Sequence, residues 1–246
     1  MTTSDTSAHL HVHPAAQHQE RYTARRRLLQ NYLLRPIGFG LLVRLHVEGL
    51  EHVPASGPTI VIMNHIAGID PFVVVGAVTS RQLVPMAKIE NYRHPIIGLM
   101  ARAWGVYPVR RGEVDRQALD STLALLEQGQ ALLIAPEGTR RPSLSEAKGG
   151  TTYVATKTNA TIVPVGLDGT DRFPATLKRL RRAQVMVRFG PAFRFRTEGR
   201  TRIPRAELHQ MTREMMVQLA SLLPEERRGV YGDVSQSSTD YLEFVD

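Results

Sequence analysis

The chain has 246 residues, which is enough for one substantial domain or two small ones. Hydrophobic residues make up 42% and charged residues 22%, as is typical of a globular protein with a real core. It contains no cysteine, which excludes disulfides, thiolate metal sites and a cysteine nucleophile and fits a reducing compartment. The formal net charge of +8 favours an anionic partner: nucleic acid, an anionic membrane surface or a phosphorylated small molecule.

The first twenty residues are polar and rich in histidine, which predicts a disordered tail over residues 1–20. His9, His11, His13 and His18 could bind a metal, but without acidic or cysteine partners a solvated tail is the favoured interpretation. The segment has no basic stretch followed by an apolar core, so we do not predict a secretory signal. Because no apolar run reaches the ~18–20 residues that span a bilayer, we expect a soluble or peripherally bound protein.

Residues 21–43 are predicted to form a basic, amphipathic helical segment. Three arginines at positions 25–27 stand beside apolar residues at helical spacing, and Pro36 predicts a break or kink. Two interpretations have equal weight: a helix that packs on its own domain, and an interfacial helix that lies on anionic lipid.

Beyond this segment, short apolar stretches alternate with amphipathic ones. Strands are predicted at residues 44–47, 59–63, 82–86, 106–109, 131–135, 161–165 and 184–189. Helices are predicted at residues 71–78, 95–103, 114–128, 148–158 and 204–223. This alternation indicates an α/β fold with a mostly buried central sheet flanked by helices, in a single domain over residues 21–223. Residues 224–246 are polar, which predicts a loosely held C-terminal tail.

The stretch NHIAGID places His65 directly after an apolar run, with Asp70 five positions later and Pro71 behind it. Asp-Pro is a favourable helix start, with Asp70 as the N-cap and Pro71 at the first helical position. Each residue taken alone is therefore interpreted as a loop histidine or a helix cap. However, His65 follows a predicted buried strand, and open α/β sheets commonly bind ligands at such strand ends.

Considered together, His65 and Asp70 can form a catalytic pair. A turn between them could return the carboxylate to the imidazole, fix its tautomer and stabilise the protonated ring. His65 would then be a competent general base near neutral pH. The sequence has no cysteine and no serine in a G-x-S-x-G context, so the pair suits activation of a substrate hydroxyl.

A second motif, PEGTR, follows another predicted buried strand. Gly138 permits a tight turn, and Glu137 and Arg140, on either side of Gly138 and Thr139, offer a carboxylate and a planar phosphate-binding group. The alternative is a polar surface loop closed by an internal Glu–Arg ion pair.

Two further predicted strand ends carry cations. Arg110 and Arg111 follow the strand at 106–109, and Lys88 follows the strand at 82–86. Paired arginines can clamp a phosphate, although basic pairs are more commonly solvated surface charges. If these strand ends meet at one edge of the sheet, the cations and His65 form one site with a base and several phosphate ligands.

Four segments in this order resemble the signature blocks of a known family. NHIAGID is similar to the NH-x-x-x-x-D motif of the glycerolipid acyltransferases, typified by the 1-acylglycerol-3-phosphate (lysophosphatidic acid) acyltransferases. GVYPVR, PEGTR and IVPVGL resemble the second, third and fourth blocks of that family, and the resemblance extends over residues 45–187. The third block departs from the family at Ala135, where an aromatic residue often precedes the proline.

The resemblance implies transfer of a fatty acyl group from acyl-CoA or acyl carrier protein to the free hydroxyl of lysophosphatidic acid, which makes phosphatidic acid. The thioester is a co-substrate, and the resemblance implies no metal or other cofactor. His65 would be the general base and Asp70 would orient it, while Asn64 would orient the loop or assist the oxyanion. The residues implied to bind the glycerol-phosphate end are Lys88, Arg110, Glu137, Gly138, Thr139 and Arg140.

The resemblance also bears on partners and location. We expect a lysophospholipid acceptor, an acyl thioester donor and an anionic membrane surface as partners, with the protein in the cytoplasm and peripherally attached to the inner face of the plasma membrane. Basic and apolar residues at 177–182 could join the membrane-facing segment 21–43.

Three alternatives follow from the same observations. Nucleic-acid binding would explain the charge, but neither a helix-turn-helix nor a zinc-finger spacing is evident, so no nucleic acid is expected. The acceptor could instead be glycerol 3-phosphate, another lysolipid or an ornithine lipid. A pseudoenzyme that binds lysolipid or acyl-CoA without turnover is the third alternative.

Overall fold

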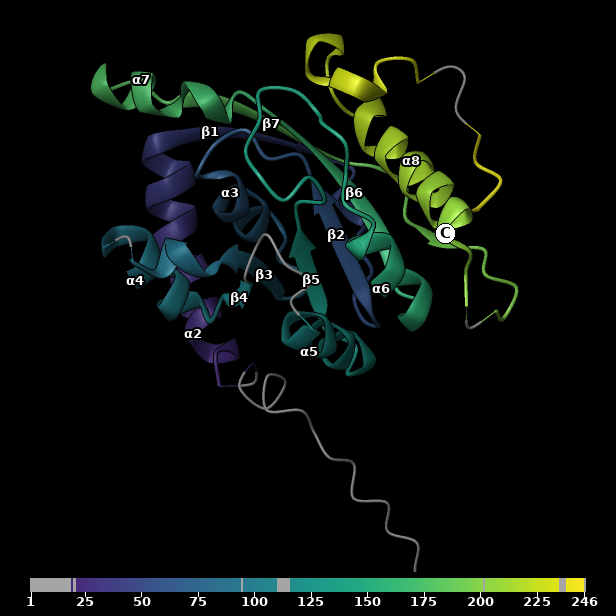
Figure 1. Ribbon diagram of the computed structural model, residues 1–246. Coiled ribbons are helices and arrows are strands. Elements are labelled where there is room, and N and C mark those ends of the chain that lie inside the picture. Colours follow the sequence, from purple (N-terminus) through teal and green to yellow (C-terminus); the bar gives the residue numbers. More distant parts are fainter. Residues whose placement is uncertain are drawn as a thin grey trace, which may run out of the picture.

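The computed structural model describes residues 19, 21–93, 95–109, 116–200, 202–234 and 238–245, and it has the expected α/β architecture (Figure 1). Its strands are β1 Val43–Glu48, β2 Thr59–Met63, β3 Leu83–Lys88, β4 Tyr107–Val109, β5 Ala131–Ile134, β6 Thr161–Asp168, β7 Ala183–Phe189, β8 Phe193–Phe195 and β9 Leu242–Phe244. Its α-helices are α2 Thr23–Leu29, α3 Asp70–Ala77, α4 Pro95–Trp104, α5 Arg116–Glu127, α6 Gly150–Thr158, α7 Phe173–Lys178 and α8 Arg205–Ser221. Between them lie the π-helix η1 Gln30–Leu42 and the 3-10 helices η2 Leu50–His52, η3 Ile89–Arg93, η4 Thr170–Arg172, η5 Glu225–Arg227 and η6 Gly229–Tyr231.

The strands form one sheet in the order β1-β7-β6-β2-β5-β3-β4, and β8 and β9 extend it beside β6. Strands β2, β3, β4, β5 and β6 run parallel to one another, whereas β7 is antiparallel to β6 and parallel to β1. The carboxyl ends of β2, β3 and β5 therefore meet at one edge of the sheet. The expected convergence of these strand ends is confirmed.

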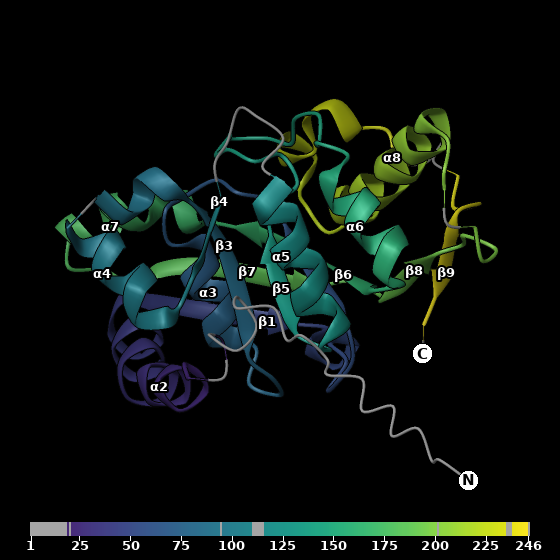
Figure 2. The ribbon, with the colours of Figure 1, turned by 60° about the horizontal axis from the view of Figure 1, so that its bottom comes forward.

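Apolar side chains fill the space on both faces of the sheet, as the near-continuous apolar strands predict. One core cluster contains residues of α5, α6 and α8, including Leu125, Val154 and Met215. The other contains residues of α3 and the last residue of α4, including Val74 and Trp104. Figure 2 shows α5 and α6 in front of the sheet and α3 with the α2 region behind it. The sheet is thus the middle of three layers.

The basic N-terminal segment is helical, and its inner side packs on the domain. Arg26 is 1% exposed; its guanidinium donates hydrogen bonds to the carbonyls of Trp104 (2.7 Å) and Gly105 (3.1 Å), and burial lowers its pKa to about 10. Gln30 donates to the carbonyls of Val75 and Val78, each at 2.7 Å. The segment changes from α- to π-helix at Gln30, upstream of the break expected at Pro36.

The segment after Leu223 packs on the domain more closely than its polar composition predicts. Leu242 is 1% exposed because β9 pairs with β8, and Tyr231 is 7% exposed. In the described ranges 224–234 and 238–245, the expectation of a loosely held tail is wrong. The reason is that a few apolar residues in a polar stretch suffice to anchor a short strand and a turn.

Candidate active site

The turn after β2 brings His65 and Asp70 together, as the motif predicts. His65 Nδ1 lies 2.8 Å from Asp70 Oδ2, and the side chains are 15% and 0% exposed. The same carboxylate oxygen accepts hydrogen bonds from the backbone N–H groups of Ile66 and Ala67, each at 2.7 Å. Three donors therefore fix the carboxylate against the imidazole and hold the turn closed.

The expectation that Asp70 is the N-cap of the following helix is wrong. Helix α3 begins at Asp70 itself, Ile69 is the N-cap, and no side chain caps the helix. The carboxylate instead points back into the turn, because the N–H groups of Ile66 and Ala67 are the donors within its reach. Asp70 Oδ1 is buried without a partner in the described structure. The contact of Oδ2 with His65 Nδ1 places the carboxylate where it can stabilise a positively charged imidazole.

Asn64 is a structural link rather than a free donor in the site. Its side-chain nitrogen donates to the Leu167 carbonyl at 2.9 Å, and its oxygen accepts from the Leu167 N–H at 2.7 Å. The residue is 2% exposed and does not line the cavity described below. It fixes the end of β2 to β6, which favours its expected role in orienting the loop over assistance to an oxyanion.

The PEGTR motif forms the turn after β5, next to the turn that carries His65 after the parallel strand β2. Gly138 adopts φ +71°, a left-handed conformation that favours glycine. The Arg141 N–H donates to the His65 carbonyl at 2.8 Å, and the Lys148 N–H donates to the Pro136 carbonyl at 3.0 Å. These bonds join the histidine turn, the PEGTR turn and the segment before α6 into one frame.

Glu137 faces inward and is not among the residues that line the cavity described below. It is 5% exposed, and Oε2 accepts hydrogen bonds from the Ser145 N–H (2.8 Å) and hydroxyl (2.9 Å). Burial raises the pKa of Glu137, and the donors of Ser145 and the nearby His65 act in the opposite direction. In the structure the carboxylate holds the loop 138–145, and its expected substrate contact stays a prediction.

The remaining predicted residues are divided between the cavity and its surroundings. Arg140 and Gly138 line the cavity, whereas the exposed Thr139 does not. Lys88 lies at the correct edge of the sheet, but its ammonium pairs with Glu90 Oε1 at 3.2 Å and lies outside the cavity wall. Arg110 and its neighbour Arg111 lie outside the described residues.

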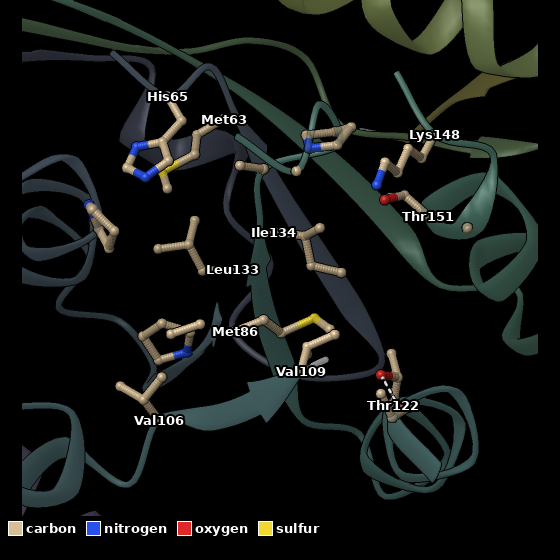
Figure 3. Close-up of a pocket in the computed structure, with 18 of the residues that line it drawn as sticks. Met63, His65, Met86, Val106, Val109, Thr122, Leu133, Ile134, Lys148 and Thr151 are labelled. Carbon is tan, nitrogen blue, oxygen red and sulfur yellow. Dashed lines mark hydrogen bonds between the residues drawn. The ribbon is translucent and has the colours of Figure 1, made fainter. Parts of the chain in front are cut away.

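A cavity of about 640 Å³ opens beside His65 (Figure 3). Its wall is mainly apolar and comes from α3, β3, α4, β4, α5, β5 and α6, with Met86, Val109 and Leu133 among the side chains. Its polar lining gathers near the PEGTR turn, where Lys148 and Thr151 join His65 and Arg140. Sequence reasoning missed Lys148 and Thr151, although the lysine just before a Gly-Gly helix start was a visible signal.

A family model described as "Acyltransferase" matches residues 44–168, which is half of the chain. This range includes His65, Asp70 and the complete PEGTR turn. The chain belongs to the acyltransferase family.

Curated acyltransferases resemble the chain over part of their lengths. A chloroplastic 1-acyl-sn-glycerol-3-phosphate acyltransferase of Arabidopsis thaliana is 31% identical over 138 residues, which are 54% of this chain and 38% of that protein. The 1-acyl-sn-glycerol-3-phosphate acyltransferase of Borreliella burgdorferi is 30% identical, over 53% of this chain and 54% of that protein. The 1-acyl-sn-glycerol-3-phosphate acyltransferase alpha of Homo sapiens is 29% identical, over 65% of this chain and 57% of that protein. The chain thus spans about half, or less, of the length of the first two.

The crystal structure of the 1-acyl-sn-glycerophosphate acyltransferase PlsC from Thermotoga maritima has the same fold. The two structures superpose with a TM-score of 0.58 and 22% sequence identity. The superposed residues make up 85% of this chain and 88% of the PlsC chain. The family match ends at the last residue of β6, so β7, β8, α8 and the C-terminal segment lie outside it.

Two further observations concern membranes and metals. No helix in the described ranges is long and apolar enough to cross a membrane. Within the same ranges, no cluster of three or more histidines and carboxylates could hold a metal ion, and the histidines of residues 1–18 lie outside them.

Proposed function

We propose that the protein transfers a fatty acyl group from acyl-CoA or acyl carrier protein to the free hydroxyl of 1-acylglycerol 3-phosphate and so makes phosphatidic acid for phospholipid biosynthesis. The observation that carries this proposal is the 2.8 Å His65–Asp70 contact at the mouth of a large apolar cavity. The names of the curated relatives support the choice of acceptor.

The geometry suits His65 as a general base. With Nδ1–H held by Asp70, the lone pair of the neutral ring lies on Nε2, and His65 lines the cavity. Nε2 takes the proton of the acceptor hydroxyl while the oxygen attacks the thioester carbonyl. The tetrahedral intermediate collapses to an ester, and the departing thiolate takes the proton from the imidazolium. Asp70 stabilises the imidazolium in between.

The cavity suits a fatty acyl chain. Its deeper wall is formed by apolar side chains such as Met86, Val109, Leu119 and Leu133, and its volume is about 640 Å³. Each methylene buried there contributes about 0.8 kcal/mol. The reacting carbonyl would lie at the polar end, beside His65.

We also propose that the outer side of α2 and η1 lies on an anionic membrane, at the inner face of the plasma membrane. Leu28, Tyr32 and Leu41 are 59%, 76% and 68% exposed, beside the exposed arginines 25, 27 and 35. Both ribbon views place α7 on the same side of the molecule as the α2 region, and Leu180 just after α7 is 95% exposed (Figures 1 and 2). Apolar groups ringed by cations favour a membrane interface.

An acceptor screen tests the proposed function. One acyl-CoA is offered with lysophosphatidic acid, glycerol 3-phosphate, lysophosphatidylcholine or monoacylglycerol, and the ester products are separated by mass spectrometry. We expect kcat/KM to be highest for lysophosphatidic acid, by at least about tenfold, because a phosphate monoester can pair with the cations at the cavity mouth. Equal rates with monoacylglycerol, or no transfer to any acceptor, would contradict the proposal.

A further inference from the structure

The amino-terminal end of α6 opens toward the cavity with free hydrogen-bond donors. The helix has nine residues, and its N-cap, Gly149, provides no side-chain cap. The first N–H groups of an α-helix have no partner within the helix, and they carry the positive end of its dipole. A Cβ built at Gly149 or Gly150 would meet no heavy atom within 4 Å, so the space beside these two residues is open. Gly149, Gly150 and Thr151 all line the cavity.

Thr151 is the second, independent observation. It is only 7% exposed, and its hydroxyl makes no hydrogen bond in the described part of the chain. The other threonines of α6 after it are all satisfied: Thr152 pairs with Thr212 at 2.7 Å, and Thr156 and Thr158 donate to backbone carbonyls at 2.9 Å. Figure 3 shows the Thr151 hydroxyl directed into the cavity. A hydroxyl that faces the cavity from a largely buried side chain, without a protein partner, points to a ligand that supplies one.

Lys148 adds a full positive charge at the same place. Figure 3 shows its ammonium at the same edge of the cavity as the Thr151 hydroxyl, and a Cβ at Gly138 would lie 3.8 Å from Lys148 Nζ. No salt bridge to Lys148 is present among the described residues, in contrast to Lys88 with its Glu90 partner. Arg140, the last residue of PEGTR, supplies a second cation nearby. Its guanidinium lies toward the histidine turn, because Nη1 would be 3.5 Å from a Cβ at Gly68.

We propose that Lys148, the Thr151 hydroxyl and the N–H groups at the start of α6 bind the phosphate monoester of the acceptor. An ammonium, a hydroxyl and helix N–H donors together match the several acceptor oxygens of a phosphate. The inference rests on the proposed function for the identity of the ligand. It favours the acceptor over the phosphopantetheine phosphate of the donor because hydrogen bonds through Arg141 and Pro136 tie this end of α6 to His65, where the acceptor hydroxyl reacts.

The test uses the full chain and three substitutions at the site. Lys148→Met and Thr151→Val remove one contact each, and Thr151→Ser keeps the hydroxyl. Lys157→Met is the matched control, because Lys157 is exposed near the other end of α6 and does not line the cavity. The KM values of lysophosphatidic acid and of acyl-CoA and the value of kcat are measured for each, and calorimetry measures binding of glycerol 3-phosphate and inorganic phosphate.

We expect Lys148→Met and Thr151→Val each to raise the KM of lysophosphatidic acid about tenfold, the loss that follows from one charge-assisted hydrogen bond. The KM of acyl-CoA and the value of kcat stay within about twofold, and Thr151→Ser and Lys157→Met behave as the wild type. An unchanged KM for lysophosphatidic acid would overturn the inference while leaving the proposed function intact. A rise in the KM of acyl-CoA alone would overturn it in favour of the donor phosphate.

A failure of the proposed function gives a different result from a failure of the phosphate site. If the wild type does not acylate lysophosphatidic acid, calorimetry still tests the site. Phosphate binding that weakens in Lys148→Met and Thr151→Val but not in Lys157→Met supports an anion site, and equal binding by all variants overturns it.

Discussion

At the scale of single residues, the structure separates side chains that face the cavity from those that hold the frame. His65, Arg140, Lys148 and Thr151 line the cavity, whereas Glu137 is turned inward. The sequence was sufficient to predict the His65–Asp70 pair, because five residues of turn leave few ways to place the carboxylate. It was not sufficient for Glu137, because residue type alone does not reveal which donor a carboxylate will find.

Asp70→Asn tests the role of the carboxylate at this scale. The amide oxygen can still accept the N–H groups of Ile66 and Ala67, so the turn is preserved, but the negative charge that stabilises the imidazolium is lost. We expect kcat to fall by about a hundredfold or more, with a much smaller change in the KM of either substrate. A kcat within a few-fold of the wild type, measured with lysophosphatidic acid and acyl-CoA, would show that Asp70 only closes the turn.

At the scale of elements, the C-terminal segment binds the loop that follows PEGTR through ion pairs and hydrogen bonds. Arg227 forms ion pairs with Asp168 (3.1 Å) and Asp171 (2.6 Å), and its guanidinium donates to the Pro142 carbonyl at 2.9 Å. The Leu144 N–H donates to the Arg227 carbonyl, and the Ala147 N–H donates to the Tyr231 hydroxyl. The segment thereby positions the loop that leads to Lys148.

Arg227→Ala should therefore loosen this loop. The substitution leaves the half-buried Asp168 carboxylate, the exposed Asp171 carboxylate and one carbonyl without their partner, so we expect a loss of about 2 kcal/mol in the free energy of unfolding. We also expect a rise in the KM of lysophosphatidic acid. Arg200→Ala is the control, because its ion pair with Glu207 is on the surface and should contribute at most about 1 kcal/mol. Equal losses in the free energy of unfolding for both variants, measured by urea denaturation, would refute this role of Arg227.

The elements themselves show where sequence reasoning succeeds. All seven predicted strands and all five downstream helices are present, with ends that differ by at most three residues. The apolar runs of β2 and β6 and the amphipathic pattern of α5 and α8 are long enough to carry a clear period. The elements missed, α7, β8 and β9, have three to six residues, too few for a period to emerge. Strand β9 also depends on a partner almost fifty residues away, which no local pattern encodes.

At the scale of the whole molecule, one side of the N-terminal helical segment holds it to the domain and the other is open. Arg26 and Gln30 are buried against α3 and α4, while Leu28, Tyr32 and Leu41 are exposed. The inner side packs on the domain, as one of the two interpretations predicts. Contact with lipid, the other interpretation, stays a proposal for the outer side. Removal of residues 1–43 would disrupt both, so point substitutions are the sharper test.

Leu28→Ser, Tyr32→Ser and Leu41→Ser combined should weaken sedimentation with vesicles that contain phosphatidylglycerol. The apolar contribution to membrane binding is lost, while the buried contacts of Arg26 and Gln30 and the net charge are unchanged. We expect binding to fall about tenfold or more, with the same thermal unfolding midpoint as the wild type. Val230→Ser, an exposed apolar residue on η6, is the control. Undiminished vesicle binding by the triple variant would exclude this surface as the anchor.

The most direct test of acyl transfer through His65 compares the wild type with His65→Ala. Both proteins are incubated with lysophosphatidic acid and a radiolabelled acyl-CoA, and labelled phosphatidic acid is counted after extraction; circular dichroism confirms that the variant is folded. We expect the wild type to form phosphatidic acid and His65→Ala to lose at least about a thousandfold of that rate, because no other base is held at the cavity mouth by a buried carboxylate in the described structure. Phosphatidic acid formed at a near-normal rate by His65→Ala, or none formed by the wild type, would contradict this mechanism.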